Sequence, residues 1–269
     1  MITYSATLDV PADTATLLSE LLAAERLRRG TGIGARAASA RDQAILVLRW
    51  FRQDADLKVL AADTRISLTT GYRYLHEGID VLAAQAPDLH QVLQAGQAAG
   101  WSHVTLDGTL IATDRCRTPH PETGHDLWYS GKHRAHGGNV QVVGDPTGFP
   151  VAVSDVEPGS TDDIPAARVT GFLGALPAAA SLLGLPSLAD KGYAGAGVGV
   201  LTPTTGGNLH PDNLTRNQLI GCLRAQGERA IALLKTRWTA LNRIRLCPQR
   251  IGAIAKAALI LTTAERPIR

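Results

Sequence analysis

The sequence has little cysteine, no long apolar run and no recognisable leader. Its 269 residues include three cysteines, which lie far apart: Cys116, Cys222 and Cys247. An odd number at such wide spacing argues against a disulfide framework and a CxxC metal knuckle, so we expect free thiols. The most apolar stretch, residues 251–263, is too short for a membrane helix and contains Lys256. Since the first residues lack a basic segment followed by an apolar one, we expect a cytoplasmic protein with no membrane partner.

Several catalytic signatures are missing as well. The chain contains no P-loop, no GxGxxG and no Ser-His-Asp set. NTP hydrolysis, dinucleotide redox chemistry and acyl transfer therefore have no support. With 45% hydrophobic and 19% charged residues, the chain is long and apolar enough for one large domain or two modest ones.

Charge is unevenly distributed, although the formal net charge is only +3. Residues 101–200 contain ten acidic and six basic residues, whereas residues 215–269 contain two acidic and eleven basic ones. Carboxylates bind divalent cations, and Lys and Arg bind phosphates. The asymmetry therefore fits a metal-dependent enzyme that acts on a polyanion. A solvated basic helix face is the simpler explanation of the composition alone.

Helical periodicity dominates the first hundred residues. Apolar spacing predicts helices over residues 11–29, 40–53, 57–63, 68–78 and 81–98.

The third and fourth of these helices, about residues 57–78, have the layout of a helix-turn-helix. Leu68, Tyr72 and Leu75 are expected to anchor the second helix in the core. A helix pair of this kind is also common as a purely structural core element. If the pair binds DNA, the outward positions that would contact it are Thr69, Thr70, Arg73 and Tyr74.

From residue 101 the pattern changes to strands and helices. Strands are predicted over 103–113, 139–144, 149–155, 186–190 and 198–202, and helices over 164–176, 213–235 and 249–263. The first three strands should form an antiparallel meander. This order predicts an α/β fold, with a ribonuclease H-like catalytic domain over residues 96–269 preceded by an all-α, DNA-binding region over residues 1–95.

Three carboxylates are candidates for catalysis and metal binding. Asp107 lies in the first strand, Asp190 ends the fourth, and Glu228 lies in the long helix. In a sheet with this strand order the first and fourth strands are neighbours, so the three side chains are expected to converge. Carboxylate oxygens suit Mg²⁺, and two ions about 3.5–4 Å apart support in-line attack on a phosphodiester. Taken singly, each aspartate is as readily explained as a turn or strand-end residue.

The long helix carries a stripe of charge. Arg224, Glu228 and Lys235 fall on one face. The two cations would contact DNA phosphates or orient Glu228, and Arg243 in the basic tail is a further expected phosphate contact. An exposed helix with one surface ion pair is the alternative for Glu228.

The loop GKHRAHGG and the segment PGSTDD leave two interpretations each. Lys132 and Arg134, with His133 and His136, form a basic loop expected to touch DNA phosphate, whereas the HxxH spacing alone would suggest zinc. Asp162 and Asp163 are predicted to cap the following helix, with support of the metal site as the alternative.

The ordered motifs carry a family resemblance. The chain contains, in order, LDGT, YSGKHRAHGGNVQVVGDPTGFPVAVSDVEPGSTDD, LADKGY and R-x3-E-x6-K. This set resembles the DDE transposases of bacterial insertion sequences related to the Harbinger group, over nearly the whole chain. The family's catalytic and metal-binding Asp, Asp and Glu fall on Asp107, Asp190 and Glu228. Its Arg and Lys fall on Arg224 and Lys235.

The resemblance implies a ribonuclease H-like fold, dependence on Mg²⁺ or Mn²⁺ with two ions, and a homo-oligomer on double-stranded DNA. It also implies cleavage at element ends and strand transfer into target DNA. The family's Y-x2-R-x3-E-x6-K pattern has a tyrosine where this chain has Gly221. Two other functions remain open: a catalytically inactive DNA-binding protein, against which the three carboxylates weigh, and a host-adapted nuclease that cuts without joining.

Overall fold

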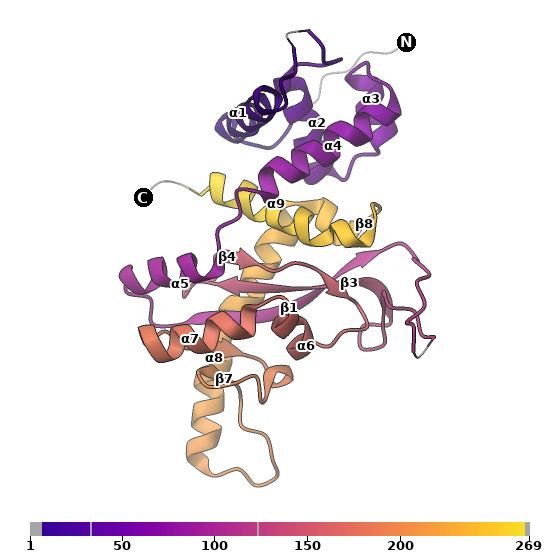
Figure 1. Cartoon of the computed structure of the whole chain (residues 1–269). Helices are drawn as coiled ribbons and strands as arrows, with labels where there is room; N and C mark the ends of the chain where they lie inside the picture. Colours follow the sequence, from indigo (N-terminus) through magenta and orange to yellow (C-terminus); the bar gives the residue numbers. More distant parts are fainter. Residues whose placement is uncertain (1–6, 33, 123, 267–269) are drawn as a thin grey trace.

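The chain folds into an N-terminal group of helices and a central mixed sheet with helices on both faces (Figure 1). The computed structural model describes residues 7–32, 34–122 and 124–266. In chain order the elements are α1 (Ala12–Arg28), α2 (Ala40–Gln53), α3 (Leu57–Asp63), α4 (Leu68–Ala83), α5 (Leu89–Ala98), β1 (Val104–Thr113), β2 (Tyr129–Ser130), β3 (Ala135–Gly144), β4 (Pro150–Val153), β5 (Glu157–Pro158), α6 (Asp163–Val169), α7 (Phe172–Leu183), β6 (Ser187–Ala189), the 3-10 turn η1 (Lys191–Tyr193), β7 (Val200–Leu201), α8 (Pro211–Arg237), η2 (Thr239–Asn242), β8 (Arg243–Ile244), η3 (Pro248–Arg250) and α9 (Ile251–Ala264).

Side-chain caps define where the N-terminal helices begin. Ser39 and Asp42 form a reciprocal capping box at the start of α2, and Asp56 and Ser67 accept backbone hydrogen bonds at the starts of α3 and α4. These caps satisfy N–H groups that have no partner within the helix. The predicted bounds of α2 and α3 are confirmed, while α4 continues past residue 78 to Ala83.

Two predicted helices are wrong as single elements, because each is divided in two. The helix expected over 81–98 is interrupted before Pro87, which has no N–H to donate, and Asp88 then caps α5. The helix expected over 164–176 is broken at Gly171, whose φ of +81° lies in the left-handed region. The resulting helices α6 and α7 meet at 82°.

β1 lies at the centre of the sheet, whose main order is β2-β3-β1-β6-β7. β3 pairs antiparallel with both β1 and β4, so the predicted meander is confirmed. β6 pairs in parallel with β1 on its other side, and β7 continues in parallel beyond β6. The two strands expected to bring Asp107 and Asp190 together are therefore neighbours.

The sheet separates two apolar clusters. Val104 and Leu106 of β1 join α5 and α7 on one face, whereas Ile111 joins α8 and α9 on the other. The second of these clusters continues without a break into α1, α2 and α4, because α9 packs between the sheet and the N-terminal helices (Figure 1). Alternation of side chains along β1 thus assigns each of its residues to one helical layer. The domain boundary near residue 95 stays a prediction.

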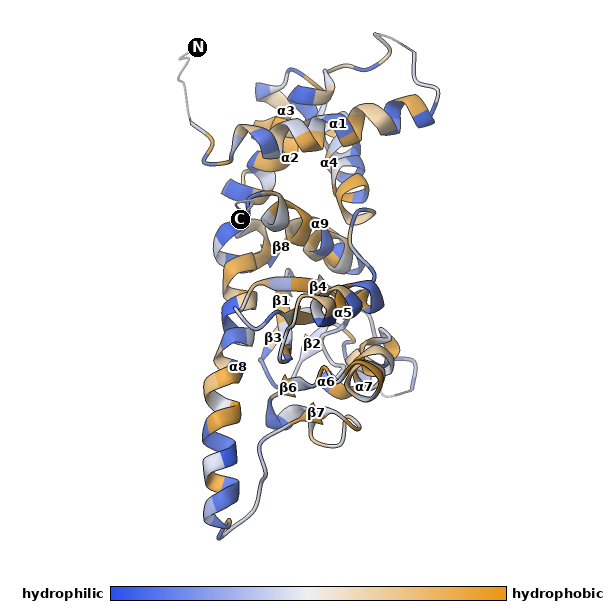
Figure 2. Ribbon diagram, turned by 90° about the vertical axis from the view of Figure 1, so that its left-hand side faces the viewer, coloured by the Kyte–Doolittle hydropathy of each residue, from blue (hydrophilic) through white to orange (hydrophobic). Residues whose placement is uncertain are grey.

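The long helix α8 has two parts. Its C-terminal half crosses the sheet, where a Cβ at Gly227 would lie 3.1 Å from the Cβ of Thr105. Its N-terminal half projects beyond the sheet, as Figure 2 shows, and carries the exposed side chains of Leu214, Leu219 and Leu223. Within the described residues no single helix is long and apolar enough to cross a membrane. Among the described helices, only the bent pair of α6 and α7, taken together, has the required length and apolarity.

Candidate active site and DNA-contacting surfaces

Strand register brings Asp107 and Asp190 side by side. Leu106 pairs with Ala189 in the parallel pairing of β1 and β6, and the two aspartates are the next residues along each strand. Asp107 shares its face of β1 with Thr105 and Thr109, which contact Gly227 and Lys235 of α8. Asp107 therefore faces the helix that carries Glu228.

Electrostatics link these carboxylates. The pKa of Asp107 is raised to about 6, mainly because the side chain is buried. The positive charge of Arg224 opposes the shift, and the negative charges of Asp190, Glu228 and Asp163 add to it. The acidic groups are therefore close enough for each to disfavour ionisation of Asp107. A bound cation would reduce the repulsion between these carboxylates.

Glu228 and Asp190 both have partners of their own. Glu228 is 61% exposed and lies 3.0 Å from Arg224 one helical turn earlier. Asp190 accepts a hydrogen bond of 2.8 Å from the backbone N–H of Gly192. In the described parts of the chain, no group of three or more His, Cys, Asp or Glu side chains is arranged to hold a metal ion. The donor chemistry fits a hard divalent cation, because all three groups are carboxylates around a concentration of negative charge.

The basic loop lies beside these carboxylates. The Lys132 ammonium group is 2.9 Å from the carboxylate of Asp163. The hydrogen bond to Asp163 raises the pKa of Lys132, and the charges of Asp190 and Asp107 add to the effect. Arg134 is exposed, with a φ of +52°.

The structure gives no support to zinc binding at the HxxH spacing. His133 is exposed in the turn, whereas His136 lies on β3, where its Nε2 is 3.2 Å from Asp126.

The predicted capping role of Asp162 and Asp163 is wrong. Asp162 occupies the N-cap position of α6 but makes no side-chain hydrogen bond there. Asp163 lies inside the first turn and points away from the helix end, to Lys132 and to Asn139 at 3.0 Å. Tertiary partners, which a local pattern does not reveal, take the place of the cap.

The expected phosphate contacts on the C-terminal part of the chain differ in exposure. Lys235 turns inward and donates to the Thr109 hydroxyl at 2.8 Å and the Leu110 carbonyl at 3.1 Å. Arg243 is exposed and pairs with Asp114 on the surface at 2.8 Å. Arg224 lies between these extremes, half-buried and paired with Glu228.

Comparison with known families decides the class of the protein. The profile of the family described as DDE superfamily endonuclease matches residues 106–263, which is more than half of the chain. The chain belongs to this family. No curated protein and no solved structure matches it significantly. Membership indicates an endonuclease-type enzyme whose substrate is DNA and whose cleavage depends on a divalent metal.

The match to the DDE superfamily endonucleases includes the three carboxylates and leaves α1–α5 outside. In this endonuclease the exposed face of α4 differs from the expected one. Thr69 and Arg73 are exposed and Thr70 is partly so, but Tyr74 is only 2% exposed and accepts a hydrogen bond from the backbone N–H of Ala38. The prediction that Tyr74 faces solvent is therefore wrong.

Tyr72, expected in the core, is instead 44% exposed. The buried stripe of α4 follows Gly71, Tyr74 and Gly78, at the three- and four-residue spacing of a helix face. The close approach of Gly71 to Ala61 and of Gly78 to Val47 fixes this stripe, and the two glycines were the signal in the sequence that sets it.

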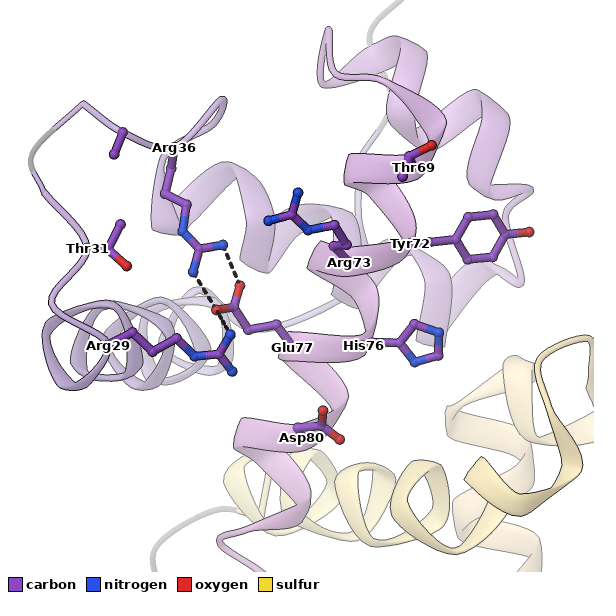
Figure 3. Close-up of a pocket in the computed structure, with 10 residues that line it drawn as sticks. Arg29, Thr31, Arg36, Thr69, Tyr72, Arg73, His76, Glu77 and Asp80 are labelled. Carbon is purple, nitrogen blue, oxygen red and sulfur yellow. Dashed lines mark hydrogen bonds and ion pairs between the residues drawn. The ribbon is translucent and has the colours of Figure 1, made fainter.

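A hollow of about 750 Å³ lies between α4 and the loop that joins α1 to α2. Figure 3 shows Thr69, Tyr72, Arg73 and His76 along α4, with Arg36 reaching from the loop. Arg36 donates to both oxygens of Glu77, at 3.1 and 2.6 Å, and so holds the loop against α4. Sequence reasoning missed Tyr72, His76 and the two loop arginines, Arg29 and Arg36.

Proposed function

We propose that this DDE superfamily endonuclease is a transposase of the Harbinger-related bacterial type, which cuts DNA at element ends and joins them to a target. The observation that carries the proposal is the side-by-side position of Asp107 and Asp190 on parallel strands, with Glu228 on the helix over the same face. A sheet in which β1 lies between antiparallel β3 and parallel β6 supports a ribonuclease H-like domain.

In this proposal Asp107, Asp190 and Glu228 would hold two Mg²⁺ or Mn²⁺ ions, and bound ions of this kind would supply Lewis-acid chemistry at the phosphodiester. Arg224 holds Glu228 in position beside the two aspartates through its ion pair. Lys132 lies beside the acidic groups and its side chain is 60% exposed, so its ammonium group can contact a DNA phosphate. Water would attack the phosphodiester at the element end and release a 3′-hydroxyl. This hydroxyl would then attack a target phosphodiester and displace the target strand's own 3′-oxygen as a free hydroxyl.

The α3–α4 pair is proposed to bind the terminal repeats as a helix-turn-helix. Thr69, Tyr72 and Arg73 present two polar groups and an aromatic ring on the exposed surface of α4. Arg73 points toward the loop that carries Arg36, whereas Tyr72 points away from this loop (Figure 3). A homo-oligomer on DNA, in the cytoplasm, completes the proposal, because two element ends require two cutting sites.

The decisive experiment compares cleavage and joining by the parent, two carboxylate variants and a control variant. Duplexes carrying the inverted repeats that flank the coding sequence are incubated with Mg²⁺ and the parent, Asp107→Asn or Glu228→Gln. Both variants keep size and hydrogen bonding while removing a negative charge, so cleavage should fall by at least about a thousandfold with DNA affinity retained. Asp114→Asn, an exposed carboxylate beyond the end of β1, is the matched control.

Each result separates the alternatives. Strand transfer from pre-cleaved ends by the parent supports the transposase, whereas cleavage without joining favours a host-adapted nuclease. Binding without cleavage by the parent favours an inactive DNA-binding protein. If Glu228→Gln cuts as well as the parent, Glu228 is only the surface partner of Arg224 and the three-carboxylate site is wrong.

A further inference from the structure

A chain of buried hydrogen bonds crosses the sheet directly behind the carboxylate site. The Tyr193 hydroxyl donates to the side-chain oxygen of Gln141. The Gln141 amide donates to the oxygen of Asn139 at 2.9 Å, and the Asn139 amide donates to Asp163 at 3.0 Å. Tyr193, Gln141 and Asn139 are all buried. The chain therefore links the turn after β6, the middle of β3 and the start of α6.

The direction of this chain is fixed by its charged end. An ionised Asp163 only accepts hydrogen bonds, so Asn139 must turn its amide nitrogen toward it and its oxygen toward Gln141. Gln141 must then turn its own oxygen toward Tyr193, which donates. The Lys132 ammonium group lies 2.9 Å from the same carboxylate. A single arrangement satisfies every amide, which makes the network rigid.

Strand β1 passes through this network at Gly108. A Cβ at Gly108 would lie 2.9 Å from the Tyr193 hydroxyl and would also collide with the carboxylate of Asp163. Gly108 faces this side of the sheet because it alternates with Asp107, which faces α8. The two sides of β1 are thus occupied by different groups: the carboxylate site on one and the hydrogen-bond chain on the other.

The turn that carries Asp190 is tied to the hydrogen-bond chain through Tyr193, whose ring is also buried in the apolar cluster on this face of the sheet. β6 is only three residues long, and Asp190 is the first residue after it. Tyr193 follows three residues later, in the short turn whose Gly192 N–H binds Asp190. The hydroxyl of Tyr193 anchors this turn to Gln141 of β3, the residue that pairs with Gly108 of β1.

We propose that Tyr193, Gln141, Asn139 and Asp163 are positioning residues, which hold the Asp190 turn at a fixed distance from Asp107 so that both bind one cation. The proposal rests on the proposed role of Asp107 and Asp190 as metal ligands. None of the four residues needs to touch the metal or DNA. Their effect is on the affinity for the ion, because outer partners that orient ligands alter metal binding strongly.

The test measures Mn²⁺ binding to the full chain by titration calorimetry, without DNA. Tyr193→Phe removes the hydroxyl that donates to Gln141. Asp163→Asn removes the charge that fixes the direction of the chain, because an amide can present either its oxygen or its nitrogen to Asn139. Each should bind Mn²⁺ about tenfold more weakly than the parent. Cleavage by both variants should recover as Mn²⁺ is raised, and the DNA affinity of Tyr193→Phe should equal that of the parent.

A matched control separates positioning from general stability. Thr262→Val removes the hydroxyl that accepts the buried hydrogen bond from Trp238, in the cluster between α9 and the N-terminal helices. It should lower the unfolding midpoint while leaving Mn²⁺ affinity as in the parent. Because Tyr193→Phe deletes a single atom from the core, it carries the test alone if Asp163→Asn does not fold.

The outcomes distinguish this inference from the proposed function. If Asp107→Asn abolishes Mn²⁺ binding but Tyr193→Phe binds as tightly as the parent, the positioning role is overturned and the carboxylate site stands. If the parent binds no Mn²⁺, or Asp107→Asn binds it equally well, the carboxylate site itself is wrong and the inference is overturned with it. The positioning role is also overturned if Thr262→Val weakens Mn²⁺ binding as much as Tyr193→Phe does.

Discussion

The ammonium group of Lys235 lies 2.8 Å from the hydroxyl of Thr109, two residues after Asp107 on β1. Burial lowers the pKa of Lys235, and a second hydrogen bond joins it to the carbonyl of Leu110. Lys235 therefore fastens the end of α8, the helix that carries Glu228, to the strand that carries Asp107. Of the two roles predicted for Lys235, contact with phosphate or orientation of Glu228, these contacts favour the second, because they join the elements that carry Asp107 and Glu228.

This arrangement predicts different effects for two cations with the same expected role. Lys235→Met should lower the free energy of unfolding by about 1–3 kcal/mol, because two charge-assisted hydrogen bonds are lost. It should leave the salt dependence of DNA affinity unchanged. Arg243→Ala should leave stability unchanged and reduce the slope of log K against log salt by about one, since an exposed phosphate contact is removed. Denaturant unfolding and binding titrations at several salt concentrations measure both. A flatter slope for Lys235→Met would contradict the inward role.

The two tyrosines of α4 should separate stability from DNA binding. Tyr74→Ala removes a buried ring and should cost about 3–5 kcal/mol of unfolding free energy. Tyr72→Ala removes an exposed ring, so stability should change by less than about 0.5 kcal/mol while affinity for terminal-repeat DNA falls. Denaturant unfolding and DNA titrations of both variants test the assignment. If a folded Tyr74→Ala protein loses affinity for DNA and Tyr72→Ala keeps it, Tyr74 and not Tyr72 contacts DNA.

Two glycines offer a matched pair of substitutions. Gly108→Ala places a methyl group against Tyr193 and Asp163, and overpacking of this kind costs about 1–3 kcal/mol. Cleavage should fall with it, since β1 shifts beside Asp107. A Cβ at Gly221, in α8, would meet no side chain and no neighbouring element within 4 Å. Gly221→Ala should therefore raise stability by about 0.5–1 kcal/mol with cleavage unchanged. Thermal unfolding of both variants gives the comparison; equal effects would show that β1 has room at Gly108.

Glu77 predicts a loss of stability in acid. Burial raises its pKa, but hydrogen bonds from Arg36 and Gln43 outweigh burial and hold the pKa below the ordinary 4.5. The ionised Glu77 therefore contributes its full share of the free energy of unfolding above its pKa in the unfolded chain. This contribution is lost as the pH falls through the lower pKa of Glu77 in the folded protein. The unfolding midpoint should fall below pH 4.5 in the parent.

Glu77→Gln should weaken this acid dependence and cost about 3 kcal/mol at pH 7, because Arg36 loses its buried partner. Asp63→Asn, which breaks a more exposed pair with Arg49, is the control and should cost less than about 1 kcal/mol. Unfolding midpoints between pH 3 and 7 compare the three proteins. An unchanged acid profile in Glu77→Gln would assign the pH dependence to other carboxylates.

Local information in the sequence determined the elements whose ends are set by neighbouring residues. The bounds of α2 and α3 follow from Ser39 and Asp56, which cap through atoms two or three positions away. The strand order around β1 followed from the order of elements along the chain. The family resemblance, carried by LDGT, LADKGY and R-x3-E-x6-K, is confirmed at the level of the DDE superfamily endonucleases.

Tertiary structure decided what depends on contacts between distant residues. Tyr72 and Tyr74 are two positions apart, and only the packing of Gly71 and Gly78 against other helices decides which ring is buried. Lys235 and Thr109 are 126 residues apart, so no local pattern turns that cation inward. The sequence by itself predicted the three carboxylates Asp107, Asp190 and Glu228, because each lies in a short motif that can be identified without the structure. Their surroundings arise when separate segments fold together, because burial and charge depend on neighbours in space.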